Sequence, residues 1–200
     1  MLAHLNKLVG QCKAEYCSFL HTGIQHEHSP GEVFTHQYVY IESITPIDAA
    51  LLVGKDEDTL CGNVLHDAYR SVLGAVAWTV LTRAELAVYV QALQRRAHAP
   101  RIKDCKRLNL VIRYMKRHKC GLRLVTLKHP LRLVGFTDAA FKAQPEEPTG
   151  IALRGLAAAL MEDNCESKPM SANGKANLVD FTVRRQRRVV RSTFLSLIHI

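Results

Sequence analysis

Residues 133–141, with the sequence LVGFTDAAF, form an apolar run that reaches one carboxylate, Asp138, and continues in small residues. Such a run predicts a buried strand that ends near the aspartate. A carboxylate at the tip of a strand can bind a divalent cation, because these hard ions prefer oxygen ligands. The string also fits a strand that enters an ordinary turn, where aspartate bonds the local backbone. The neighbouring segments decide between the two interpretations.

Four further segments flank this run in a particular order. Upstream stand YRSVLGAVAWTVLTRAEL (residues 69–86) and NLVIRYMKRHKCGLRL (109–124), and downstream come PTGIALRGL (148–156) and VDFTVRRQRRVVRSTF (179–194). Together with LVGFTDAAF, this order resembles the end of the Pol polyprotein of copia-type retrotransposons, from about Tyr16 to Phe194. The resemblance implies the last part of a reverse transcriptase, a helical connection and the start of a ribonuclease H domain.

The resemblance also implies a chemistry for the parent polyprotein. That chemistry is RNA-directed DNA synthesis together with cleavage of the RNA strand in RNA/DNA hybrids. Asp138 would be the first of several carboxylates that hold two Mg²⁺ ions, which activate water and stabilise the leaving oxygen. One carboxylate cannot hold both ions, so the reaction needs partner carboxylates.

Those partners do not fall on acidic residues of this sequence. The family's next glutamate follows a Ser/Thr-rich helix start that matches residues 191–194, and its position aligns with Leu197. The ending LSLIHI, residues 195–200, resembles a non-native extension in place of the family's helix. The aspartate pair of the polymerase belongs to a hairpin that would precede this sequence. We therefore expect a truncated fragment without catalytic activity.

The composition favours a partner with negative charge. The 200 residues include 27 lysines and arginines against 18 acidic residues, which gives a formal net charge of +9. With 48% hydrophobic and 22% charged residues, the chain has a globular composition rather than a disordered or membrane one. An RNA/DNA hybrid or duplex nucleic acid is the expected partner. The alternative function is that of a small basic nucleic-acid-binding or structural protein without a catalytic role.

Two groups of cations are candidates for nucleic-acid contacts. The first could line the path of a hybrid, because guanidinium groups bind phosphates in a fork geometry, or it could be a charged edge strand that opposes pairing. The second lies on a basic helical segment, residues 101–119, which could instead be a solvated helix face. The first group is Arg184, Arg185, Arg187, Arg188 and Arg191, and the second is Arg113, Lys116 and Arg117.

The cysteines and histidines indicate neither a disulfide framework nor a zinc site. Six cysteines stand at irregular spacings in a chain rich enough in apolar residues for a core, which favours a reducing, intracellular setting. The first residues, MLAHLNKLVGQC, lack the apolar core of a signal peptide, and no run is long enough to cross a membrane. We expect surface histidines, because the following set matches no common zinc spacing: Cys12, Cys17, His21, His26, His28 and His36.

The pattern of apolar residues predicts an α+β fold, with a hairpin and a helical connection followed by a truncated ribonuclease H-like mixed sheet. A hairpin and a helix are expected over residues 16–44, with a turn at residues 29–32. A solvated loop is expected over residues 45–66, which contain the acidic run at residues 56–58 and a possible short helix at 47–53. The expected domains are a reverse transcriptase remnant (1–66), the helical connection (67–120), the ribonuclease H-like half-domain (121–194) and the tail (195–200).

Helical and strand periods define the remaining elements. Helices are expected over residues 67–80, 83–96 and 101–119, with Asp67 and Thr82 as caps and with Tyr69 and Trp78 in the core. Strands are expected over residues 122–127, 131–138, 150–160 and 178–188. The third helix has one apolar stripe, formed by Ile102, Cys105, Leu108, Ile112 and Met115.

Overall fold

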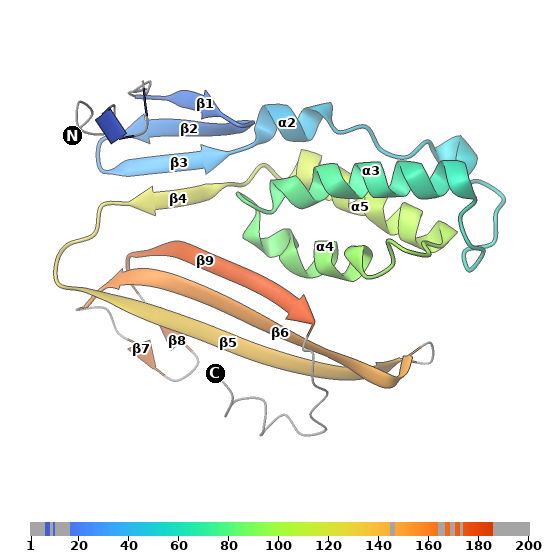
Figure 1. Ribbon diagram of the computed structural model, residues 1–200. Helices are drawn as coiled ribbons and strands as arrows, with labels where there is room; N and C mark the ends of the chain where they lie inside the picture. The colour runs from blue at the N-terminus through green and yellow to red at the C-terminus, as the bar shows by residue number, and fades with distance from the viewer. Residues whose placement is uncertain are drawn as a thin grey trace.

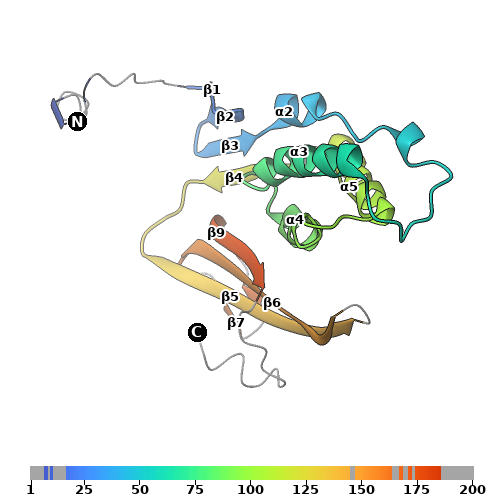
Figure 2. The same cartoon turned by 45° about the vertical axis from the view of Figure 1, so that its right-hand side comes forward.

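The computed structural model describes residues 7–8, 10, 17–144, 147–163, 167–168, 171–172 and 174–185. These residues form two main antiparallel sheets and a group of helices (Figure 1). The α+β class is therefore confirmed. The helices lie beside the end of the first sheet, and α4 (Ala87–Gln94) lies on the side that faces the second sheet, as both Figure 1 and Figure 2 show.

The N-terminal sheet has the strand order β1-β2-β3-β4. Its strands are β1 (Phe19–His21), β2 (Ile24–Ser29), β3 (Glu32–His36) and β4 (Leu122–Val125). β2 and β3 form the expected hairpin, in which Ser29 pairs with Glu32 and Gly31 takes a positive φ of 79°. The helix α2 (Tyr38–Ser43) follows, so the prediction for this region is confirmed.

The fourth strand of this sheet comes from a distant part of the chain. Residues 122–125 pair with β3, with Val33 opposite Leu124, although about ninety residues separate them. A Cβ atom on Gly121 would lie 2.3 Å from the carbonyl oxygen of Thr35. Only glycine permits this close approach, which places β4 beside β3. The first strand expected after Gly121 therefore completes the N-terminal sheet.

Three helices enclose the main apolar core. They are α3 (Asn63–Thr79), α4 and α5 (Ile102–Arg117); the short 3₁₀ turn η1 (Ala49–Leu51) precedes α3, and η2 (Ala84–Leu86) lies between α3 and α4. The predicted stripe on α5 is confirmed, because all five of its side chains are buried in this core. Tyr69 is also buried as expected, and its hydroxyl donates to the carbonyl oxygen of Leu93 at 2.8 Å.

Other details of the helical prediction are wrong. α3 begins at Asn63, after Gly62, so Asp67 lies inside the helix and does not cap it. The Thr82 hydroxyl donates to Oε1 of Gln37 at 2.9 Å instead of capping a helix, and the segment that follows is divided between η2 and α4. Trp78 is 42% exposed, because α3 turns its indole away from the core. The periodicity located the helices but misplaced their ends.

The C-terminal sheet has the strand order β5-β6-β9. β5 (Leu131–Gln144), β6 (Glu147–Glu162) and β9 (Ala176–Arg185) are antiparallel, and β7 (Ser167–Lys168) with β8 (Ser171–Ala172) forms a separate short ladder. Among the described residues, the outer edge of β5 has no partner strand. The Asn177 amide joins the two sheets, since it accepts from Val125 N at 2.8 Å and donates to Val125 O at 2.9 Å.

Candidate nucleic-acid interface

The exposed side of α5 combines arginines with apolar and aromatic side chains. Arg107, Arg113 and Arg117 are exposed, while Leu110 and Tyr114 between them are 55% and 44% exposed. These positions share one side of the helix because residues three or four apart are neighbours on its surface. We call these five residues the α5 basic face. Guanidinium groups beside an exposed ring suit a nucleic acid, whose phosphates attract cations and whose bases stack on aromatic rings.

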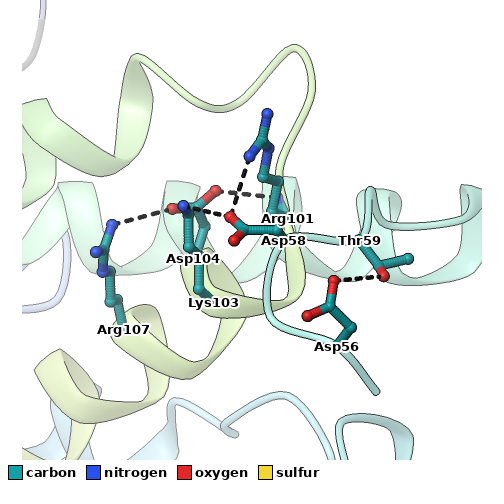
Figure 3. Close-up of polar contacts among 7 residues, drawn as sticks. All are labelled: Asp56, Asp58, Thr59, Arg101, Lys103, Asp104 and Arg107. Carbon is teal, nitrogen blue, oxygen red and sulfur yellow. Dashed lines mark hydrogen bonds and ion pairs between the residues drawn. The ribbon is translucent and has the colours of Figure 1, made fainter. Parts of the chain in front are cut away.

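The acidic run neutralises the cations at the start of α5 (Figure 3). Oδ1 of Asp58 accepts from Lys103 Nζ at 2.6 Å and from Arg101 Nη1 at 3.1 Å. Glu57 Oε1 accepts from Lys106 Nζ at 2.9 Å. The Lys103 ammonium, followed by the Arg101 guanidinium, holds the pKa of the Asp58 carboxyl below its usual range. The run is exposed, as expected for a loop, but Glu57 and Asp58 are paired with cations at the start of α5, while Asp56 accepts from the Thr59 hydroxyl in the same loop.

The same segment is fixed to α5 by an amide. Nδ2 of Asn109 donates to the carbonyl oxygen of Ile47 at 2.7 Å, and Oδ1 of Asn109 accepts from Ile47 N at 2.9 Å. Ile47 and Leu52 are buried against the core. Residues 46–57 therefore form a wall beside α5. The predicted loop is present, with a 3₁₀ turn at Ala49–Leu51 inside the expected short helix of 47–53, but it is packed against the core and not fully solvated.

A cavity lies on each side of the α5 basic face. One, of about 810 Å³, is enclosed by residues 46–57 and α5, and its cationic lining is Lys103, Lys106, Arg107 and Arg113. The other, of about 660 Å³, lies between α4 and α5 and is lined by Arg95, Arg96 and Tyr114 among others. Arg107 and Leu110 border both cavities. The basic face is thus a ridge between two hollows whose linings contain both cations and carboxylates, including Glu57 in the first and Asp104 in the second.

The predicted cations of this helix have different surroundings. Arg113 and Arg117 are exposed on the basic face, and neither has an ion pair within the described part of the chain. Lys116 instead donates to the carbonyl oxygen of Glu42 at 2.9 Å, and so ties α5 to the last turn of α2. Arg107 was predicted only as part of the basic segment 101–119, and Tyr114 was not predicted as a contact, although both are three or four residues from Leu110.

Asp138 lies within a strand and not at its end. β5 continues to Gln144, and Asp138 is paired with Gly155 in the middle of the ladder, so the predicted strand end is wrong. Its Oδ1 accepts from the backbone N–H of Ala139 at 2.8 Å. Asp138 borders a shallow groove of about 450 Å³ between η2 and the C-terminal sheet. Within the described ranges no three His, Cys, Asp or Glu side chains come together, so the groups around Asp138 do not fit two Mg²⁺ ions.

Arg184 and Asp138 lie on opposite faces of the C-terminal sheet. The ladder aligns Asp138 with Gly155 and Val183, and the next row aligns Ala139 with Arg154 and Arg184. Successive rows of a sheet point to opposite faces. Arg184 and Arg154 are both exposed and form a pair of cations on adjacent strands, of which only Arg184 was predicted. The side chain of Arg185, together with Arg187, Arg188, Arg191 and Leu197, lies outside the described residues.

The histidines of the N-terminal sheet do not form a metal site in the described part of the chain. The expectation of surface histidines is wrong for His36, which is buried and contacts Glu27 Oε1 through Nε2 at 2.9 Å. His26 stacks on Phe19 with ring centroids 4.6 Å apart. Partial burial, followed by the nearby His21 and His28, lowers the pKa of His26. Over the same described ranges, every helix is too short or too polar to span a bilayer.

Comparisons with known proteins add no family assignment. The chain matches no family model, no curated protein and no solved structure.

Proposed function

We propose that this chain is a segment of a copia-type Pol polyprotein, covering the end of the reverse transcriptase, the helical connection and the first strands of a ribonuclease H-like sheet. The order of elements supports this proposal, since a hairpin and helix precede three helices and then antiparallel strands. In this proposal the chain binds an RNA/DNA hybrid or duplex nucleic acid through the α5 basic face. Binding is sequence-independent, because the contacts are to phosphates.

The single observation that supports binding most strongly is the position of the free positive charge on α5. The cations of its first turns are paired with Asp58 and Glu57, whereas Arg113 and Arg117 have no ion pair in the described residues. Arg107 contacts Asp104 at 3.5 Å but keeps 63% of its side chain exposed. Exposed guanidinium groups can exchange their counterions for phosphates at little desolvation cost. Tyr114 stands among them, where a base or sugar could pack.

Catalysis is not part of the proposed activity of this chain. For the parent polyprotein we propose Mg²⁺ as the cofactor, held by Asp138 and further carboxylates. The described residues around Asp138 do not supply that set. Mg²⁺ or Mn²⁺ should therefore produce no cleavage of a labelled hybrid, and cleavage that disappears in Asp138→Asn would overturn this part of the proposal.

Fluorescence anisotropy with a labelled RNA/DNA hybrid tests the binding site. The test variant replaces Arg107, Arg113 and Arg117 with serine. The matched control replaces three exposed cations elsewhere, Lys55, Arg70 and Lys128. Each triple change lowers the formal net charge from +9 to +6, because three positive charges are removed from the +9 of the chain.

The two variants should differ in affinity and in salt dependence. Each phosphate contact contributes about 0.9 to the slope of log K against log salt, so loss of three contacts should reduce that slope by up to about 3. The control variant should lose only the small contribution that long-range electrostatic attraction makes to the affinity. Equal weakening of both variants, or binding that does not depend on salt, would exclude the α5 basic face as the site.

A further inference from the structure

Two cysteine sulfurs meet where residues 59–61 pass the start of α5. The Sγ atoms of Cys61 and Cys105 are 3.5 Å apart, close enough for one thiol to hydrogen-bond to the other. The backbone around them is fixed, because Cys61 N donates to the carbonyl oxygen of Pro100 at 2.9 Å and Ile102 N donates to that of Thr59 at 3.0 Å. A disulfide bond is about 2.0 Å long, so the sulfurs need to approach by about 1.5 Å.

The two thiols differ in accessibility. Cys105 is fully buried, and this burial, followed by the Cys61 hydrogen bond, raises its pKa to about 12. Cys61 is partly exposed. Because the thiolate is the nucleophile and must reach its target, Cys61 is the sulfur that a reagent in solution can meet first. Cys105 can then react only at the Cys61 sulfur, after a reagent has formed a mixed disulfide with Cys61.

We propose that Cys61 and Cys105 form a redox-reactive dithiol that closes to a disulfide by exchange with a small-molecule disulfide such as glutathione disulfide. The Cys61 thiolate attacks one sulfur of glutathione disulfide, whose S–S bond breaks and releases one glutathione thiolate. Cys105 then attacks the Cys61 sulfur, its proton passing to the departing glutathione sulfur, which breaks the mixed disulfide and releases the second glutathione as its thiol. The cysteine pair loses two electrons, and glutathione disulfide gains them as it becomes two glutathione molecules.

Closure would link α5 to the segment that follows the wall of one cavity. Cys61 follows the segment that contains Glu57, and Cys105 lies in the helix that supplies Lys103 and Lys106 to the same cavity. The bond would therefore link α5 covalently to the segment that directly follows the wall of this cavity. The other described cysteines, Cys17 and Cys120, are exposed and have no sulfur within hydrogen-bonding distance among the described residues. They can form mixed disulfides but have no described second thiol to resolve them, so they serve as internal controls.

Peptide mass spectrometry of the full chain tests the proposal. The reduced protein is incubated with glutathione disulfide, quenched with an alkylating reagent and digested. We expect a peptide pair linked through Cys61 and Cys105, while Cys120 is recovered as its glutathione adduct. Recovery of Cys61 as a stable glutathione adduct beside an alkylated Cys105, or of both as free thiols while Cys120 is modified, would overturn the proposal.

Two variants test the order of the steps. Cys105→Ala should stop at the glutathione adduct of Cys61, and Cys61→Ser should leave Cys105 unmodified while Cys120 still reacts. Glutathione on Cys105 in the Cys61→Ser protein would show that Cys105 reacts first and would overturn the proposed order. The wild-type cross-link does not depend on either variant, so the proposal can still be refuted if Cys105→Ala fails to fold.

Discussion

Replacing Glu85 with alanine should destabilise the protein strongly, because it removes the counter-charge of a buried guanidinium. The Arg83 side chain is completely buried, and its Nε donates to Oε1 of Glu85. Nη1 and Nη2 of Arg83 have no hydrogen-bond partner among the described residues, and its guanidinium carbon lies 5.8 Å from the centre of the Tyr114 ring. Glu85 is therefore the main group that compensates this charge.

The expected loss in the free energy of unfolding is about 3 kcal/mol. Removing one partner of a buried ion pair costs about 3–5 kcal/mol, and the lower end applies because the Glu85 side chain is 39% exposed. Arg83→Met, which removes the charge and keeps much of the volume, should be within about 1 kcal/mol of the wild type or more stable. The double variant Arg83→Met/Glu85→Ala should then recover most of the loss, which gives a coupling energy near 3 kcal/mol.

Urea unfolding followed by far-UV circular dichroism measures these differences. The control is Glu42→Ala, which removes an exposed glutamate from α2 and should change the free energy of unfolding by no more than about 0.5 kcal/mol. The denaturant slope should be equal in all variants, so that midpoints can be compared. The argument fails if Glu85→Ala is as stable as Glu42→Ala, or if Arg83→Met is as damaging as Glu85→Ala.

Three other predictions follow from single contacts. Asn109→Leu should cost about 3 kcal/mol in the free energy of unfolding, because the buried backbone N–H and C=O of Ile47 both lose their partner; hydrogen exchange at Ile47 should accelerate with it. Wild type should be more stable than Asp58→Asn at pH 6, and this difference in stability should vanish as the pH falls below about 4. The reason is that a carboxyl with a lowered pKa stabilises the fold only while it is ionised. Urea unfolding midpoints of both proteins across this pH range measure the difference. Leu133→Lys should reduce concentration-dependent association in light scattering without a large change in melting temperature, since this 68% exposed leucine lies on the open edge strand β5.

Local patterns allowed a good prediction of α5 and the hairpin. The stripe of Ile102, Cys105, Leu108, Ile112 and Met115 has the helical period, and every member is buried. The turn at residues 29–32 contains a proline and a glycine, which favour a hairpin turn. In both cases the sequence pattern and the element that it predicts span the same short stretch of residues.

Partners that are distant in sequence could not be predicted in this way. Nothing in the composition of residues 122–125 shows that they pair with β3, which depends on the approach at Gly121. Arg83 has the character of a surface residue, and its burial follows from the way η2 packs against α5. Similarly, nothing in the sequence of the acidic run indicates that its partners are Lys103 and Lys106, which lie about 45 residues later.

The candidate site on the C-terminal sheet is another case in which the sequence did not show which residues lie together in space. Asp138 and Arg184 were both selected by residue type, but whether they share a face depends on the register of three strands. A shift of one residue would exchange the faces. A sequence specifies the register of a strand when one face is apolar and the other polar. The runs LVGFTDAAF and GIALRGLAAAL have apolar or small residues on both faces, so they do not specify the register. The observed register separates the two charges, so phosphates held by Arg184 and Arg154 would lie across the sheet from Asp138.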